Sequence, residues 1–268
     1  MQVYCIAFHS FIWFRYWKRP AWPAPSKRQE TLSERKMWQE MQLLHEPVSR
    51  PCVLVACEES QAVCIAFRER GIEAYSCDIL EQSGGHPEWH IQGDALQLIN
   101  GNCEFTTSDG KRHSIIGKWS LLIAHPPCTY ISNAGARHLY AGGSLNEERL
   151  RKGIKATHFF LRFLYADCDR IAVENPVPST VYCLPKYTQI IQPWMFGHPQ
   201  QKKTCLWLKC LNPLLPTDIT SERTSTKVAR WFNTGGKDRQ KNRAKTFPRI
   251  AKAMAKQWGD EIIETERT

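Results

Sequence analysis

The chain of 268 residues is long enough for one large domain or for one domain with a small appendage. Hydrophobic residues make up 42% and charged residues 23%, so the sequence can bury a core, and this excludes a chain that is disordered throughout. Its 36 Lys and Arg exceed its 26 Asp and Glu, which gives a formal net charge of +10. This surplus indicates a polyanionic partner, with nucleic acid as the first expectation and an acidic membrane surface as the second.

The first 50 residues differ in composition from the rest of the chain. Aromatic and basic residues crowd the stretch 11–19, a Pro-rich stretch follows over 20–25, and a short helix is predicted over 31–44. One interpretation is an arm that binds nucleic acid by stacking and charge. The favoured interpretation is a poorly ordered N-terminal extension, because a regular hydrophobic pattern begins only after residue 50.

Residues 51–208 alternate between apolar and amphipathic segments, which predicts a catalytic core of α/β class. The apolar run 52–56 is typical of a buried parallel strand, and the spacing of apolar residues over 60–70 predicts a helix that Gly71 ends. Further strands are expected over 72–77, 119–124, 171–173 and 204–208, helices over 147–165 and 247–258, and a polar loop over 100–118. The alternation predicts a doubly wound, mostly parallel sheet with a ligand crevice at the carboxyl ends of its strands.

The C-terminal part of the chain separates into two expected regions. Residues 209–245 are short, basic near their end and carry an aromatic pair, so they are predicted to be a small DNA-recognition region that contacts phosphates. Solvated surface charge is the alternative interpretation. Residues 246–268 are expected to form a helix that packs back on the core.

The eleven cysteines predict neither a disulfide framework nor a zinc site. Their number is odd, no two stand in a C-x-x-C pair, and none has zinc-ligand spacing beside a pair of histidines. Reduced cysteines in a cytoplasmic protein without a bound metal are therefore expected. No apolar run approaches the roughly 18–20 residues that cross a bilayer, so no membrane-spanning segment is expected.

One cysteine follows a predicted strand in a stiffened loop. The segment His125-Pro126-Pro127-Cys128 fixes φ at two adjacent positions, so the thiol of Cys128 is presented with little entropy left to lose. A nucleophilic cysteine also needs a lowered pKa, which His125 or a helix N-terminus would help to supply. A buried cysteine in a turn is the alternative.

Two further polar segments follow neighbouring strands. Glu174 and Asn175 end the strand over 171–173, so in a parallel sheet they can lie beside Cys128. A carboxyl group in a partly apolar pocket has a raised pKa and can donate a proton, whereas a capping or salt-bridged glutamate is the alternative role. The third segment runs from Phe196 to Thr204 and leads into the last strand.

Three motifs follow one another along the chain: Pro-Pro-Cys, then Glu-Asn, then Phe-Gly-x-Pro-Gln-x-Lys ahead of a strand. Their order resembles that of the cytosine-C5 DNA methyltransferases. Within that family the chain looks most like the short cytosine-methylase-like proteins of bacteriophage and prophage genomes. The resemblance covers roughly residues 52–258 and implies a Rossmann-like fold. It also implies S-adenosylmethionine as the cofactor and double-stranded DNA as the partner of a monomeric enzyme.

The resemblance carries catalytic roles onto three residues. Cys128 resembles the nucleophile that adds to C6 of a flipped-out cytosine, and Glu174 resembles the acid that engages N3, so that C5 can take the methyl group. Lys202 stands where the family has an arginine beside the base. Contacts with the DNA substrate are implied for Pro127, Asn175, Gln200, Arg239 and Lys241.

The cofactor loop departs from the family pattern. Where the family carries Phe-x-Gly-x-Gly, this chain has Cys57-Glu58-Glu59-Ser60 and no glycine. A helix N-terminus at Ser60 would still receive a carboxylate. Contacts with the cofactor are implied for Glu58, Ser60, Asp78, Ile79, Asp94, Pro126 and Thr246.

Three other functions stay open. The glycine-poor loop and Lys202 also suit a non-catalytic DNA-binding relative that protects phage DNA without methylation. Another possibility is an enzyme of the same fold that acts on RNA or uses a different one-carbon donor. A zinc protein comes last.

Overall fold

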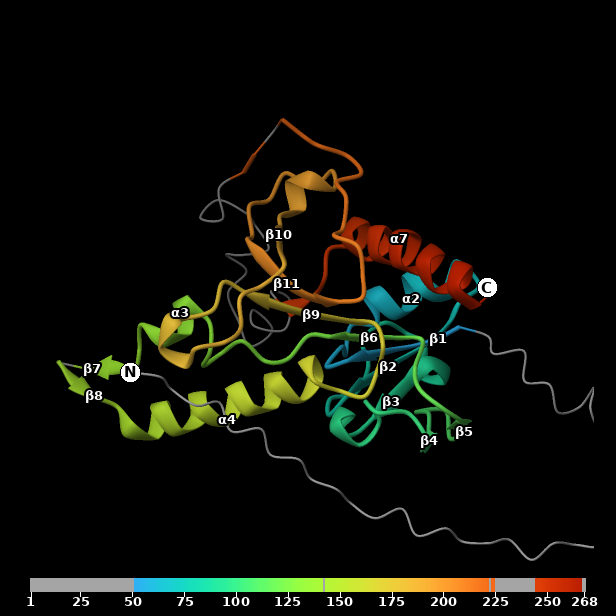
Figure 1. Cartoon of the computed structure of the whole chain (residues 1–268), viewed down its shortest axis with the longest axis horizontal. Coiled ribbons are helices and arrows are strands. Elements are labelled where there is room, and N and C mark those ends of the chain that lie inside the picture. The colour runs from blue at the N-terminus through green and yellow to red at the C-terminus, as the bar shows by residue number, and fades with distance from the viewer. Residues whose placement is uncertain (1–50, 142, 222, 225–243, 267–268) are drawn as a thin grey trace, which may run out of the picture. The chain divides into compact units, whose positions relative to one another are not determined.

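The computed structural model describes residues 51–141, 143–221, 223–224 and 244–266, so the expected extension 1–50 and its helix over 31–44 lie outside the described residues. The described part is built on a seven-stranded sheet with the order β10-β11-β9-β6-β1-β2-β3 (Figure 1). In chain order its strands are β1 (Cys52–Ala56), β2 (Glu73–Asp78), β3 (His90–Gln92), β6 (Leu121–Ala124), β9 (Ile171–Pro176), β10 (Gln189–Ile191) and β11 (Thr204–Lys209).

The sheet is mostly parallel. Strands β3, β2, β1, β6 and β9 pair in parallel, and β11 runs antiparallel to both of its neighbours, β9 and β10. From β1 the chain builds outward to β2 and β3 and then returns to the other side of β1 to form β6. The predicted α/β class with a mostly parallel sheet is therefore confirmed. The strand order reverses between β1 and β6, and in such sheets ligands bind at the carboxyl ends of the strands beside this point.

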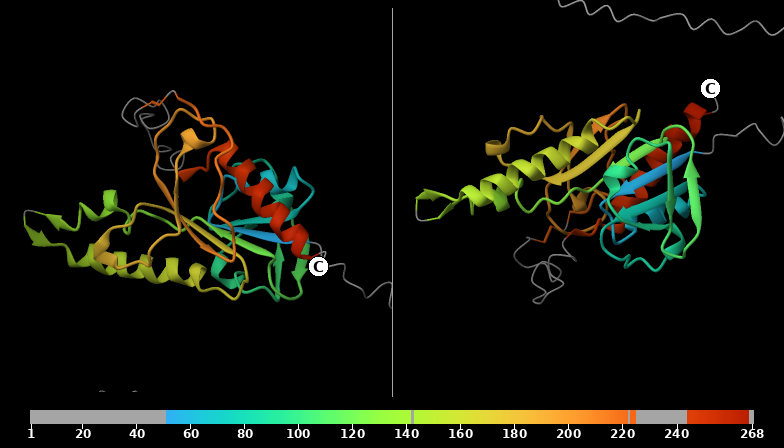
Figure 2. Two further views of the ribbon diagram at one scale, coloured as in Figure 1. Left: turned by 45° about the horizontal axis from the view of Figure 1, so that its top comes forward. Right: turned by 90° about the horizontal axis from the view of Figure 1, so that it is seen from below.

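Helices cover both faces of the sheet, because alternate residues of each buried strand point to opposite sides. Leu54 packs with Phe160 and Phe163 of α4 (Glu147–Leu164) on one face. Val53 packs with residues of α2 (Ala62–Arg68) and α7 (Pro248–Glu266) on the other face. Figure 2 shows α4 on one side of the sheet and α2 with α7 on the other.

The C-terminal helix α7 lies within the expected helical region 246–268 and continues past 258, where the predicted apolar spacing ended. The apolar stripe continues from Trp258 to Ile262, one helical turn later, and both side chains are fully buried. Ion pairs Arg70–Asp260 and Lys252–Glu69 join α7 to the chain around α2.

The polar loop predicted over 100–118 is wrong in part, since it contains a hairpin of β4 (Cys103–Thr106) and β5 (Arg112–Ile115). Gly110, with φ +85°, lies in the turn between them. Phe105 faces inward, and its ring centroid lies 4.9 Å from that of Tyr75. The alternation was hidden because Phe105 is the one buried residue of the two strands, while Cys103 on the same side of β4 is half-buried against the core.

The remaining elements are short. A second hairpin of β7 (Tyr140–Ala141) and β8 (Ser144–Leu145) precedes α4, and α3 (Asn133–Ala136) precedes that hairpin. Four 3-10 turns complete the described part: η1 (Pro87–Trp89), η2 (Ala95–Gln97), η3 (Thr180–Tyr182) and η4 (Pro193–Met195). Within the described ranges, no helix combines the length and the apolar character that a bilayer span requires.

Candidate active site

The loops that follow β6 and β9 are joined by hydrogen bonds. The side-chain amide of Asn175 donates to the carbonyl oxygen of Pro126 at 2.8 Å, and this bond is buried. Further along the two loops, the backbone of Asn133 donates to Val177, and that of Ser179 donates to Ile131. These bonds run on both sides of Cys128, so the thiol loop is held against the end of β9, which extends past the expected 171–173 and includes Glu174 and Asn175.

His125 and Glu174 form a buried pair at the base of these loops. Nδ1 of His125 lies 3.2 Å from Oε2 of Glu174, and the two side chains are 8% and 16% exposed. Burial alone would lower the pKa of His125, but the hydrogen bond and charge of Glu174 and the charge of Glu58 raise it overall. Burial alone would raise the pKa of Glu174, but His125 and Lys202 lower it overall. Both shifts favour the charged forms, imidazolium for His125 and carboxylate for Glu174.

The sequence suggested that His125 helps to lower the pKa of the Cys128 thiol, but in the structure its hydrogen-bond partner is Glu174. Its Nδ1 faces Glu174, and its buried Nε2 has no hydrogen-bond partner among the described residues. His125 therefore serves the carboxyl group. Cys128 is half-buried, and its backbone carbonyl oxygen accepts a hydrogen bond from the backbone N–H of Ser132. The side chain of Ser132 in turn caps α3.

The segment ahead of β11 completes the surroundings of Glu174. The charge of Lys202 and a hydrogen bond with Thr204 both lower the pKa of Glu174. Gln200, two residues before Lys202, has a buried Oε1 without a hydrogen-bond partner in the described part of the chain. A buried acceptor of this kind is costly unless a donor meets it, so it points to a ligand or a water at this place. Thr204 was missed from the sequence, although it opens the strand that follows the recognised motif.

Two predicted cofactor acids end neighbouring strands. Asp78 closes β2, and Asp94 follows β3 and caps η2 through a bond from the backbone of Leu96. The backbone of Gly93 donates to the carbonyl oxygen of Asp78 at 2.8 Å, which draws the two strand ends together. Burial raises the pKa of Asp78. Ile79, directly after Asp78, is 74% exposed and offers apolar surface beside the acids.

Glu58 performs a different task from the one that the resemblance implies. Its two carboxyl oxygens accept from the backbone N–H groups of Val63 and Cys64 at 2.7 and 3.2 Å. The predicted helix 60–70 accordingly begins only at Ala62, after Gln61 in a left-handed conformation with φ +58°. Burial raises the pKa of Glu58 to about 7, and the nearby His125 charge opposes this rise. Ser60, predicted to start the helix, lies in the turn that precedes it.

S-adenosylmethionine fits the two ends of this region unequally. Asp78 and Asp94 offer carboxylates that ribose hydroxyls can donate to, and Ile79 offers an apolar surface for a purine face. The amides of α2, expected to receive the carboxylate of the methionine end, already bond Glu58. The adenosine half is thus matched by this chain, and the methionine half would meet Glu58.

The remaining predicted residues are distributed as follows. Pro127 is exposed beside the half-buried Cys128. Thr246 is half-buried and lies next to Phe247, whose ring centroid is 5.0 Å from that of His198, so this motif reaches the segment around Lys202. Arg239 and Lys241, with most of the predicted recognition region, lie outside the described residues.

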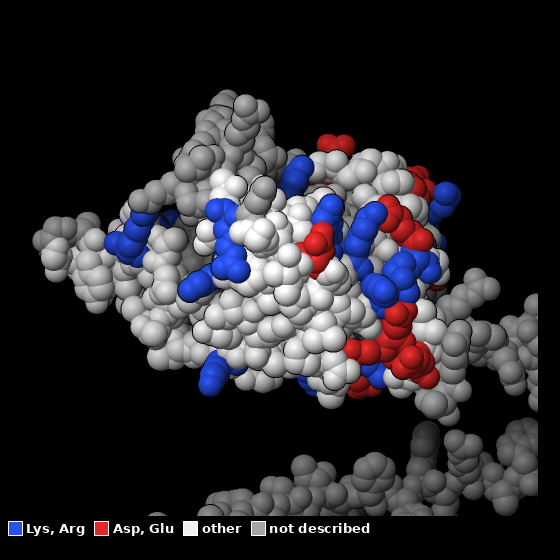
Figure 3. Space-filling view, turned by 90° about the horizontal axis from the view of Figure 1, so that it is seen from above, with Lys and Arg blue, Asp and Glu red and all other residues white. Residues whose placement is uncertain are grey.

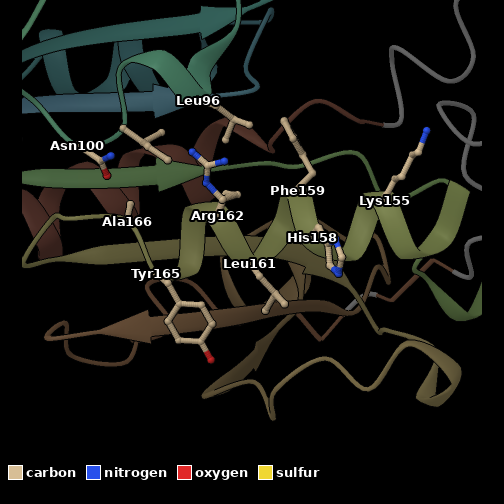
Figure 4. A pocket seen from close by; sticks show the side chains of 10 residues that line it. Leu96, Asn100, Lys155, His158, Phe159, Leu161, Arg162, Tyr165 and Ala166 are labelled. Atoms are coloured by element: carbon tan, nitrogen blue, oxygen red, sulfur yellow. The ribbon is translucent and has the colours of Figure 1, made fainter. Parts of the chain in front are cut away.

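A groove of about 660 Å³ lies elsewhere, along α4, and is lined by residues such as Phe159, Arg162 and Leu96 (Figure 4). None of the residues that line it belongs to the predicted site. The candidate site therefore consists of the strand-end loops rather than of this groove.

The charge on the molecular surface is partly paired. On the face that Figure 3 shows, basic and acidic side chains are interspersed on one side. Arg249 and Asp218 form one of the ion pairs among the described residues. Every cysteine in the described part of the chain is a free thiol. Within that part, no group of three or more His, Cys, Asp or Glu residues could hold a metal ion.

Comparison with known proteins yields a likeness in structure only. No protein-family model and no curated protein matches the sequence. Among solved structures, the chain is similar to a mutant of Spodoptera frugiperda DNMT2, with 16% identity and a TM-score of 0.32. The match covers 65% of this chain and 54% of that one, so the chain matches about half the length of the DNMT2 chain. The mostly parallel seven-stranded sheet with helices on both faces is a Rossmann-like α/β fold.

Proposed function

We propose that this protein is a cytoplasmic, monomeric DNA methyltransferase that transfers a methyl group from S-adenosylmethionine to C5 of cytosine. The observation that carries the proposal is the bond from Asn175 to the carbonyl of Pro126, because it holds the thiol loop of Cys128 against the end of β9, which carries Glu174. The reaction needs a thiol and an acid on the same base. A thiol loop joined in this way to the strand of the acid meets that requirement.

In the proposed reaction each group has one task. The thiol of Cys128 loses its proton to water, and the resulting thiolate forms a bond to C6 of a cytosine that has left the DNA stack. Glu174 donates a proton to N3, so the ring becomes an enamine with a nucleophilic C5. Lys202 stabilises negative charge beside the ring. The cofactor, when bound, supplies an electrophilic methyl group for C5. The C5 proton then passes to water, the C6–S bond breaks with its electron pair on sulfur, and the N3 proton returns to Glu174, which restores the aromatic ring; the thiolate regains a proton from water.

Cofactor binding in this proposal relies on the acids at the strand ends. Asp78 and Asp94 would accept from the ribose hydroxyls, and Ile79 would pack on the adenine. Since Glu58 caps α2, the methionine end would be bound without those amides. Contacts of Gln200 and Asn175 with the base, and of the basic region 209–245 with DNA phosphates, belong to the same proposal.

The test is methyl transfer to cytosine-containing duplex DNA by the full chain. We expect transfer by the unmodified protein, loss of transfer in Cys128→Ser, and a covalent complex with DNA that carries 5-fluorocytosine. Cys210→Ser is the matched control, because Cys210 is an exposed thiol just after β11, at the edge of the sheet opposite to the strand-end loops. Equal transfer by Cys128→Ser and Cys210→Ser would exclude the thiol mechanism.

A second function is favoured by Glu58. A side chain of the protein already bonds the amides of α2, which suits a DNA-binding protein that blocks a site without transferring a methyl group. Such a protein would bind DNA in a salt-dependent way and would show no affinity for S-adenosylmethionine. Calorimetric titration with the cofactor separates the two functions. The same transfer assay with RNA in place of DNA tests a changed substrate.

A further inference from the structure

The histidine ahead of the Pro-Pro-Cys motif is fixed by the sheet. The backbone of His125 donates to the carbonyl oxygen of Ala56 at 2.9 Å, which extends the pairing of β6 with β1 by one residue. The ring thus lies at the point where the strand order reverses. It is buried there, so its position is set by packing rather than by solvent.

The ring makes one polar contact and leaves one nitrogen without a partner. Because an ionised Glu174 can only accept, the 3.2 Å contact with Oε2 requires a proton on Nδ1 of His125. Nε2 is buried and has no hydrogen-bond partner among the described residues. In the imidazolium, the second proton of the ring therefore resides at this nitrogen.

Three charged groups face the ring, each from a different segment. Glu174 comes from β9, Glu58 from the turn after β1, and Lys202 from the segment ahead of β11. The two carboxyl groups favour the charged ring, and the lysine opposes it. On balance these groups raise the pKa of His125, which favours a proton on the ring beside the Glu174 carboxylate.

This proton on the ring answers a need of the proposed reaction. N3 of cytosine is an acceptor, so an ionised carboxylate cannot bond it until a proton is supplied. Lys202 and His125 keep Glu174 ionised in the resting protein, so the proton has to come from a neighbour.

We propose, on the basis of the proposed function, that His125 is a positioning residue that fixes the Glu174 carboxyl group and supplies the proton with which it engages cytosine N3. The Nδ1–H bond of His125 breaks, and an O–H bond forms on Glu174. The bonding pair stays on Nδ1, which leaves a neutral imidazole with its proton on Nε2. The neutral carboxyl group, free to turn about its Cγ–Cδ bond, then donates to N3. Release of the product reverses the transfer, so no net proton is consumed by the pair.

The first test is the pH dependence of the single-turnover methylation rate, which reads the pair as one titrating unit. His125→Asn keeps a neutral donor near the position of Nδ1 and removes the ionisable proton. We expect this variant to lose activity on the alkaline side at a pH at least about one unit lower than the unmodified protein, because Glu174 alone must then hold the proton. Its affinity for S-adenosylmethionine should change by less than about twofold.

The second variant separates positioning from proton supply. His125→Ala removes both donor and proton, so we expect the alkaline shift of His125→Asn together with a rate at least about tenfold lower at every pH. His158→Asn is the matched control, since His158 is exposed on α4 and lines the separate groove. A rate profile of His125→Asn that superimposes on that of the unmodified protein would overturn the proposal.

A measurement without turnover keeps the inference separate from the proposed function. Labelled histidine side chains, followed by NMR through a pH titration, report the pKa of His125, and His125→Asn identifies its signal. We expect a pKa above the ordinary value of about 6.5, which falls by at least about one unit in Glu174→Gln. An unchanged pKa in Glu174→Gln overturns the pair whether or not the protein is active. A protein that shows the pair but no methyl transfer overturns the proposed function and, with it, the supply step.

Discussion

The side-chain amide of Asn175 donates a buried 2.8 Å hydrogen bond to the backbone carbonyl of Pro126. This bond joins residues that are 49 positions apart in the sequence and connects the thiol loop after β6 with the end of β9, which carries Glu174. Its donor is a side chain, so a single substitution can remove it without changing the backbone.

Asn175→Asp should separate the thiol loop from the end of β9 while keeping the size of the side chain. A carboxylate oxygen would face the Pro126 carbonyl, and two acceptors without a shared proton repel each other. We expect unfolding in urea to require about 1–3 kcal/mol less free energy than for the unmodified protein. Capture of 5-fluorocytosine DNA should fall at least about tenfold. The control is Asn212→Asp at an exposed position before the last helix, and equal effects of both variants would contradict this account.

Glu58 should make the stability of the protein depend on pH. Its pKa is about 7 in the folded protein against an ordinary 4.5, so between these values the folded state holds a proton that the unfolded state has lost. Stability from this group is therefore fully present below pH 4.5 and is lost as pH rises through 7. We expect the loss to reach on the order of 2–3 kcal/mol.

Urea unfolding at several pH values measures this contribution. Glu58→Gln should flatten the decline between pH 4.5 and 7, since the amide does not titrate and can still accept from the first turn of α2. The control, Glu81→Gln, changes an exposed carboxyl group after β2. Parallel stability curves for Glu58→Gln and the unmodified protein would mean that Glu58 is ionised throughout.

Gly153→Ala should destabilise the protein even though alanine favours helices. Gly153 is buried in α4, and a Cβ atom there would lie 2.2 Å from ring atoms of Tyr182 in η3. Alanine would add about 1 kcal/mol from helix propensity, whereas overpacking typically costs about 1–3 kcal/mol. We expect a net loss in urea unfolding. Adding Tyr182→Leu should recover part of it, and strictly additive effects of the two changes would refute the collision.

Asp78→Asn and Glu174→Gln should separate binding from chemistry under the proposed function. Asn retains the oxygen that accepts from the backbone of Leu80 at 2.9 Å, so the turn after β2 is preserved. We expect Asp78→Asn to weaken S-adenosylmethionine binding about tenfold and Glu174→Gln to lower turnover at least about tenfold with cofactor affinity nearly unchanged. Calorimetry and turnover at saturating cofactor measure the two effects. The reverse pattern would exchange the roles of the two acids.

The strand ends could be read from the sequence because buried parallel strands are continuous apolar runs. The run 52–56 coincides with β1, and the polar residues after 124 were recognised as a loop. Glu174 and Asn175, expected to follow the strand 171–173, still belong to β9. The hairpin of β4 and β5 escaped recognition, because Phe105 is the one buried residue of its two short strands. The helix α7 lies within the expected helical region 246–268, although the apolar spacing was followed only to Trp258.

The site was predictable as a set of residue types and not as a set of contacts. Cys128, Glu174 and Lys202 were selected from motif order, and their roles remain a proposal. The partner of His125 could not be predicted, because its neighbours in the sequence suggested the thiol, while the pairing of β6 with β9 brings Glu174 to the ring. Likewise, only the turn after β1 reveals that Glu58 caps α2.

The sequence by itself determined the class of the fold, the order of its main strands and the loops that hold polar groups, because hydrophobic periodicity and proline positions act locally. Only the tertiary structure decided which groups share a proton and which bond the backbone. Those properties depend on burial and on distances between strands that are far apart in the chain. His125 and Glu174 are 49 positions apart, and the residues next to either one do not indicate that the two side chains meet.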